Sequence, residues 1–161
     1  MMEYTVSGGG ITIAGASTLV FINPAAAPKP NLEFLRFWIG QSQNATSAQQ
    51  RAQLETQVTA FPTLTSATPA ALKRAGPVSN IVGGTAGAAG TAGIDASAEG
   101  AGAKTQILDD AFNVLNGWLH VPTPKETIVM PASSASGLGL FLPVAPAQLD
   151  NWAFGATYAE V

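Results

Sequence analysis

The chain has 161 residues, a length that suits a single domain with its own hydrophobic core. Charged residues make up 11% and hydrophobic residues 47%, whereas about a quarter of an average soluble domain is charged, so we expect an unusually neutral surface. A net charge of −3 provides no basic footprint for nucleic acid. Because the chain has no cysteine, disulfides and thiolate metal sites are excluded.

Two long uncharged stretches, 4–28 and 127–149, could be mistaken for a signal peptide and a membrane helix. Three consecutive glycines at 8–10 interrupt the first stretch, which also lacks a positively charged start. Three prolines interrupt the second, and a spanning helix broken in this way would leave backbone groups unpaired in lipid. We therefore expect a soluble chain that is neither secreted nor inserted in a membrane.

The first elements in chain order are two short strands, Ile11–Ile13 and Leu19–Ile22. The proline-rich segment at 23–31 follows, and its composition predicts an extended connector.

Two strand-like segments, LEFLRFWIG at 32–40 and QQRAQLETQV at 49–58, flank a polar stretch, so we predict an antiparallel hairpin with Leu35 opposite Leu54. Alternation then divides the side chains between two faces. The inward set is Leu35, Phe37, Ile39, Ala52, Leu54, Thr56 and Val58. The outward set is Phe34, Arg36, Trp38, Arg51, Gln53 and Glu55.

The segment 81–103 consists almost entirely of Gly, Ala, Thr and Ser, which offer little apolar area against the entropy of ordering them. We predict a long loop or arm that becomes ordered through neighbouring chains. The next segment, 105–117, has Ile107, Leu108, Ala111, Phe112 and Leu115 on one helical stripe. It is interpreted as a short helix that ends at Asn116-Gly117, with an irregular strand as the alternative.

The last third of the chain reads as the wall of a β-sandwich. Ile128–Met130 and Leu138–Leu142 are apolar runs ended by prolines. Trp152, Phe154, Ala156 and Tyr158 occupy every second position, as in a half-buried strand. The sequence therefore predicts one all-β domain over 1–161, an antiparallel sandwich with long loops and at most one or two short helices.

Candidate catalytic residues are few. EGAGAKT at 99–105 resembles a phosphate loop but lacks the required glycine before Lys104, and no buried strand leads into it. His120 is the single histidine and is expected to point outward from a strand. Asp109 and Asp110 are adjacent and would point in different directions on a helix. We therefore expect no enzyme and no cofactor or metal site.

The strongest binding candidate is the outward face of the predicted hairpin, because arginine beside aromatic residues is typical of interface hot spots. Its candidate interface residues are Phe34, Arg36, Trp38, Arg51 and Glu55. An equally weighted interpretation is a stabilising ladder within one chain, with an arginine over Trp38 and an ion pair to Glu55.

Four segments together, LEFLRFWIGQSQNATSAQQRAQLETQ, GPVSNIVGGTAG, FNVLNGWLHVPTPKETIVMP and NWAFGATYAEV, give the chain an overall pattern that resembles small virion proteins of tailed phages, similar to capsid decoration (cement) proteins. The resemblance implies a jelly roll or related β-sandwich without enzymatic activity. It further implies synthesis in the host cytoplasm, a place on the capsid surface of the virion, binding to the major capsid protein or another virion protein, and commonly a homotrimer.

Two alternatives remain open at this stage. One is a jelly-roll module that recognises carbohydrate or a host surface, with Trp38, Trp118 and Trp152 as stacking residues. The other is a structural subunit of the phage tail or neck.

Overall fold

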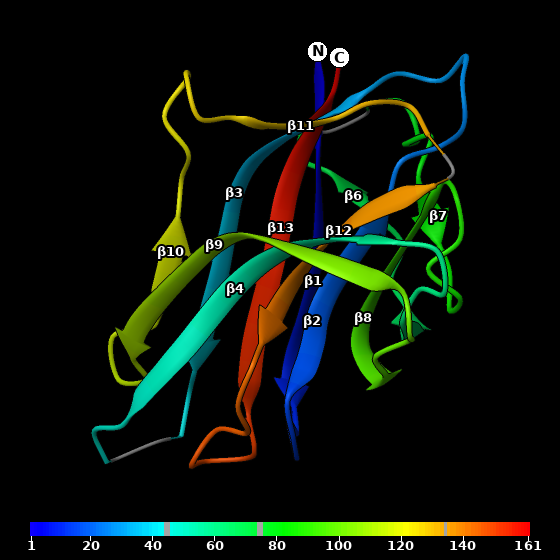
Figure 1. Cartoon of the computed structure of the whole chain (residues 1–161). Helices are drawn as coiled ribbons and strands as arrows, with labels where there is room; N and C mark the ends of the chain where they lie inside the picture. Colours follow the sequence, from blue (N-terminus) through cyan, green and yellow to red (C-terminus); the bar gives the residue numbers. More distant parts are fainter. Residues whose placement is uncertain (44–45, 74–75, 134) are drawn as a thin grey trace.

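The computed structural model describes residues 1–43, 46–73, 76–133 and 135–161. All regular structure within these ranges is β-strand, arranged in two sheets that pack face to face (Figure 1). The strand pairs are antiparallel, apart from one short parallel pair. The all-β sandwich is therefore confirmed, whereas no helix forms within the described ranges. In particular, these ranges hold no helix with the length and hydrophobicity needed to cross a membrane.

Sheet A has the strand order β10-β3-β13-β1-β6, and β11 also pairs with β3. Its strands are β1 (Met2–Ile11), β3 (Leu32–Gln41), β6 (Ala70–Ala71), β10 (Trp118–His120), β11 (Ile128–Met130) and β13 (Trp152–Glu160). The N-terminal strand thus begins well before the predicted Ile11–Ile13 segment and ends at Ile11.

Sheet B has the order β5-β8-β2-β12-β4-β9, and β7 pairs with β8. Its strands are β2 (Ser17–Asn23), β4 (Gln49–Val58), β5 (Thr63–Ser66), β7 (Val82–Gly83), β8 (Thr91–Ala98), β9 (Ala103–Asn113) and β12 (Ser136–Leu142). The predicted strand at Leu19–Ile22 lies in β2, and the one at Leu138–Leu142 lies in β12. The connector between β2 and β3 is interrupted by a turn rather than fully extended.

From β1 to β4, and again from β9 to β13 with the exception of β10 to β11, each connection passes from one sheet to the other. Without β5 to β8, the row β10-β3-β13-β1 faces the row β2-β12-β4-β9. This is the eight-stranded arrangement of a jelly roll, in which long connections link antiparallel strands of two sheets. Strands β5, β7 and β8 extend sheet B beyond β2.

The core lies between the two sheets, and β13 runs through the centre of sheet A. Trp152, Phe154, Ala156 and Tyr158 are all fully buried, as their alternation predicts. Of the intervening positions, Ala153 is exposed, whereas the small residues Gly155, Thr157 and Ala159 are buried, and the Trp38 ring lies against Gly155.

The predicted hairpin of β3 and β4 is wrong, because the two strands belong to opposite sheets. Strand β3 pairs with β13 on one side and with β10 and β11 on the other. Strand β4 pairs with β12 and β9, so Leu35 and Leu54 are not partners. The polar stretch after β3 carries the chain across the sandwich, which sequence periodicity cannot distinguish from a hairpin loop.

A β-bulge at Leu35 changes which residues of β3 face the core. Arg36 is opposite Thr157 and Phe34 is opposite Tyr158, which leaves Leu35 as the additional residue. Phe34 is therefore buried, and its ring stacks on Phe37 with centroids 5.5 Å apart. Its predicted outward position is wrong. Phe37 and Ile39 face inward as predicted.

Strand β4 follows its predicted alternation in its middle but not at its end. Ala52 and Leu54 are fully buried, whereas Val58 is exposed. Gln53 is buried although it was assigned to the outward set, because it lies between β9 and β12 and its amide donates to Gln106 at 2.9 Å.

The predicted arm at 81–103 is also wrong, because this segment contains β7 and β8 within sheet B. Ile81, Ala92 and Ile94 are buried. A Cβ at Gly93 would lie 2.6 Å from the Cβ of Leu64, so the small residues here allow close approach of neighbouring strands.

The predicted helix at 105–117 is a strand, as the alternative interpretation had it. Residues 103–113 form β9, which pairs along its length with β4 and has a bulge at Ile107. The expected stop at Asn116-Gly117 forms a turn, where Gly117 adopts a φ of 69° that favours glycine.

A buried polar cluster fixes the chain at 77–81 to the end of β13. The Glu160 carboxylate accepts hydrogen bonds from Ser79 Oγ at 2.6 Å and from the Asn80 amide at 2.7 Å. Ser79 Oγ also lies 2.8 Å from the hydroxyl of Tyr158. Burial raises the pKa of this hydroxyl above its ordinary value, the bond with Ser79 opposes the rise, and the Glu160 charge adds to it.

Because the Tyr158 hydroxyl is buried, we expect the protein to lose stability at alkaline pH. A tyrosine exposed in the unfolded chain loses its proton near pH 10, whereas the buried Tyr158 of the folded protein keeps it. Above about pH 10, unfolding therefore releases a proton, and the free energy of unfolding falls as the pH rises. In Tyr158→Phe this fall is expected to be shallower, as measured by denaturant unfolding at several pH values. If the free energy of unfolding fell equally steeply in the two proteins above pH 10, Tyr158 would not be the cause, even if the two values differed at neutral pH.

Gly155 predicts a second stability effect. A Cβ at this position would overlap the Trp38 ring and lie 2.7 Å from the carbonyl oxygen of Val6. We expect Gly155→Ala to lower the free energy of unfolding by about 1–3 kcal/mol, the usual range for overpacking. Gly40→Ala is the matched control, because a Cβ there has nothing within 4 Å. Equal melting temperatures for the two variants would exclude tight packing of Trp38 on β13.

Candidate functional site

The five candidate interface residues do not form one surface. Phe34 lies in the core, Arg36 and Trp38 lie on the outer face of sheet A, and Arg51 and Glu55 lie on β4 in sheet B. The sequence interpretation placed them together because it paired β3 with β4.

Arg51 and Glu55 are engaged within sheet B by ion pairs to β9. Arg51 pairs with Asp109, which lowers the pKa of that carboxyl group through a direct hydrogen bond. Glu55 lies 3.5 Å from the ammonium group of Lys104. The predicted ion pair between an arginine and Glu55 is therefore wrong, because Glu55 pairs with Lys104 and Arg51 pairs with Asp109, both on β9.

Arg36 and Trp38 form a stacked pair on the outer face of sheet A. The guanidinium carbon of Arg36 lies 5.4 Å from the centre of the Trp38 ring, and Arg36 Nε donates to Thr157 Oγ1 at 3.0 Å. An arginine over Trp38 was predicted, and the arginine in this position is Arg36, from the same strand. The pair is preorganised, because both side chains rest on the small residues of β13.

Exposed aliphatic side chains extend this pair to the edge of the sheet. Leu119 of β10 lies directly opposite Trp38, and Val129 of β11 lies opposite Glu33. Residues opposite each other in a ladder share a face, so both point outward, with exposed fractions of 65% and 51%. We call Arg36, Trp38, Leu119 and Val129 the edge patch.

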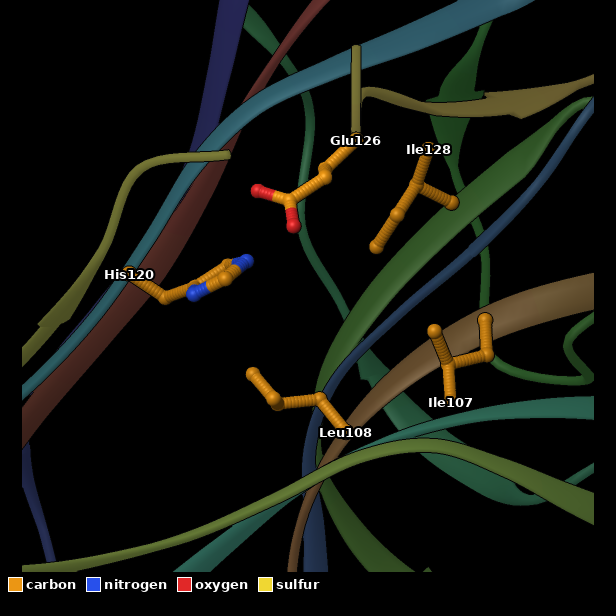
Figure 2. A pocket seen from close by; sticks show the side chains of 5 residues that line it. All are labelled: Ile107, Leu108, His120, Glu126 and Ile128. Atoms are coloured by element: carbon orange, nitrogen blue, oxygen red, sulfur yellow. The ribbon is translucent and has the colours of Figure 1, made fainter. Parts of the chain in front are cut away.

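A pocket of about 210 Å³ opens beside the edge patch, between β9 of sheet B and β10 and β11 of sheet A (Figure 2). It is lined by Ile107, Leu108, His120, Glu126 and Ile128. His120 pairs with Phe37 and Ile128 with Phe34, both inward positions of β3. The pocket is thus the open flank of the sandwich, and the expectation that His120 points outward is wrong.

Two polar side chains enter this pocket from different segments. Figure 2 shows the His120 ring and the Glu126 carboxylate directed into the space between the aliphatic side chains. The His120 ring stacks on Trp118 with centroids 5.9 Å apart. Glu126 is fixed by the turn that precedes β11, because its Oε2 accepts a hydrogen bond from Thr123 Oγ1 at 2.8 Å and its amide donates to the Thr123 carbonyl at 2.8 Å.

Asp110 adds a further negative charge close to this site. Its carboxylate accepts a hydrogen bond at 3.0 Å from the indole nitrogen of Trp118, the residue that stacks on His120. That bond, together with one from the Ala111 amide, lowers the pKa of the Asp110 carboxyl group. The flank therefore carries negative charge beside an apolar wall.

The segment that resembles a phosphate loop has a structural role. The Lys104 ammonium lies 2.9 Å from Glu99 and 4.1 Å from the centre of the Phe141 ring. Gly102 packs against backbone carbonyls at the end of β4, which leaves no open cradle at that glycine. Within the described ranges, no group of three or more His, Asp and Glu side chains is arranged to hold a metal ion.

Comparison of the chain with models of protein families, with curated proteins and with solved structures gives no match. The site is therefore interpreted from its own residues and geometry.

Sequence reasoning found half of the edge patch and missed the pocket. Arg36 and Trp38 were found because their alternation lies within one strand. Leu119 and Val129 become part of the same face only through pairing with β3. The alternation of Leu119 and Val121 was visible in the sequence, but nothing there indicated which face of which sheet they occupy.

Proposed function

We propose that the chain is a non-enzymatic structural subunit that docks on the protein shell of a tailed phage, as a capsid decoration protein does. The observation that carries this proposal is the edge patch, in which Leu119 and Val129 are exposed beside the stacked pair of Arg36 and Trp38. Tryptophan and arginine are enriched among the residues that contribute most to protein interfaces.

The composition of the surface supports docking on protein. Cores of interfaces are depleted in charge, and only 11% of this chain is charged. The edge patch is also rigid, since Trp38 covers Gly155 and Arg36 is bonded to Thr157. A preorganised patch loses little conformational entropy when a partner covers it.

The proposed subunit is a homotrimer on the capsid surface. Most soluble oligomers have closed symmetry, and repeated docking on a symmetric shell favours a subunit of matching symmetry. A subunit of the tail or neck would use the same chemistry on another virion surface, so the choice between these surfaces depends on which assembly the protein binds.

The carbohydrate alternative has weaker support. Trp152 is fully buried and Trp118 is nearly so, which leaves Trp38 as the one partly exposed ring among the three stacking candidates. Arg36 already lies over that ring.

Docking predicts that Leu119→Ser weakens binding without unfolding the protein. The proposed partner is the shell assembled from the major capsid protein of the same virion, and binding is measured by co-sedimentation. Losing one well-packed aliphatic contact at an interface is expected to weaken binding by about tenfold, equivalent to about 1.4 kcal/mol. Leu72→Ser is the matched control, because Leu72 is exposed at 43% and follows β6 at the opposite edge of sheet A.

Trp38→Ala is expected to impair shell binding more than it lowers the melting temperature. The reverse ranking would assign the edge patch to the fold alone.

If the shells bound neither the wild type nor its variants, the proposed role as a decoration protein would be rejected. A sedimentation mass of 16.4 kDa, that of one chain, at all micromolar concentrations would reject the free trimer.

A further inference from the structure

The pocket opens at the same edge of sheet A that carries Leu119 of the edge patch. Leu119 and His120 are neighbours on β10, and successive side chains of a strand point to opposite faces. Leu119 belongs to the edge patch and His120 lines the pocket. Because β10 is the edge strand of sheet A, a protein that covers Leu119 and extends past this edge reaches the pocket on the other face.

The size of the pocket suits one side chain. Pockets for drug-sized ligands have volumes of about 300–1,000 Å³, whereas this one has about 210 Å³. An anchoring side chain that fills a pocket next to a flat patch is a common arrangement of interface hot spots.

The lining residues specify an occupant with an apolar stem. Ile107, Leu108 and Ile128 form an aliphatic wall, and Figure 2 shows them around the space that His120 and Glu126 enter. An unbranched aliphatic chain in this space would replace water along that wall.

The polar groups specify a positively charged end. Glu126 contributes a carboxylate to the pocket, and the Asp110 carboxylate lies close by, bonded to Trp118. Among the residues that the structure describes, those lining the pocket include no lysine or arginine. Oε2 of Glu126 accepts a bond from Thr123, so a bidentate guanidinium would have to share that oxygen with the threonine hydroxyl. An ammonium group is a compact point charge with three donors, which suits one carboxylate oxygen and one imidazole nitrogen.

We propose that this pocket binds an alkylammonium group, and that its occupant in the assembly is a lysine side chain of the docking partner. The source of the lysine rests on the proposed function, whereas the binding of an alkylammonium group does not. The aliphatic stem packs on Ile107, Leu108 and Ile128, and the ammonium donates to Glu126 and His120.

The test is an NMR titration of the whole protein with n-butylammonium, observing the methyl groups of Ile107, Leu108 and Ile128. n-Butanol is the uncharged probe of the same length. We expect n-butylammonium to shift these methyl signals with a lower Kd than n-butanol, and added salt to reduce the difference.

Glu126→Gln keeps the acceptor for Thr123 and removes the charge. Because Glu126 is exposed at the rim, we expect n-butylammonium to bind this variant about three- to fivefold more weakly, the range of an exposed ion pair. Glu3→Gln removes an equal charge from β1 and should leave the Kd unchanged. Equal affinity for the two probes, an unchanged Kd in Glu126→Gln, or no shift of the three residues would each overturn the alkylammonium site.

The lysine of the partner is tested separately with the assembled shells. Weaker co-sedimentation of Glu126→Gln than of Glu3→Gln would support it, and equal co-sedimentation would overturn it. If the shells bound no form of the protein while n-butylammonium still bound in the pocket, the proposed function would be rejected. The assignment of the pocket as an alkylammonium site would stand.

Discussion

The burial of β13 on both faces is the constraint on which the rest of the molecule depends. Its large side chains fill the space between the sheets, so the residues between them must be small where β1 and β3 lie close. Gly155 and Thr157 meet this requirement, and Trp38 and Arg36 of β3 lie over them. The same constraint therefore produces the packed core on one side and the rigid aromatic pair on the other.

The two flanks of the sandwich differ, and this difference locates the candidate site. On one flank the additional strand β8 reaches sheet A, where a Cβ at Gly8 would lie 2.8 Å from the Ile94 side chain. On the other flank β9 faces the short strands β10 and β11, and the core ends at a pocket. Aliphatic side chains, a histidine and a carboxylate are thus accessible on the side where nothing in the described chain closes the sandwich.

The sequence was sufficient to predict several of the strands, but not their partners. Periodicity is a local property, and it identified β2, β12 and the buried face of β13. Pairing in a jelly roll joins segments far apart in the chain, so consecutive strands β3 and β4 resembled a hairpin. Bulges added to the difficulty. The additional residue at Leu35 reversed the alternation of β3, and the one at Ile107 gave β9 a spacing similar to that of a helix.

The glycine- and alanine-rich segment at 81–103 shows why composition was a poor guide to the remainder. Small residues add little apolar area, and for an isolated segment this argument favours disorder. In the sandwich they occupy places where neighbouring strands leave no room for larger side chains, as Gly93 does against Leu64. The candidate site follows the same logic. His120 lines a pocket, rather than facing solvent, because β10 pairs with β3 in a register that aligns it with Phe37, and only the tertiary fold supplies that register.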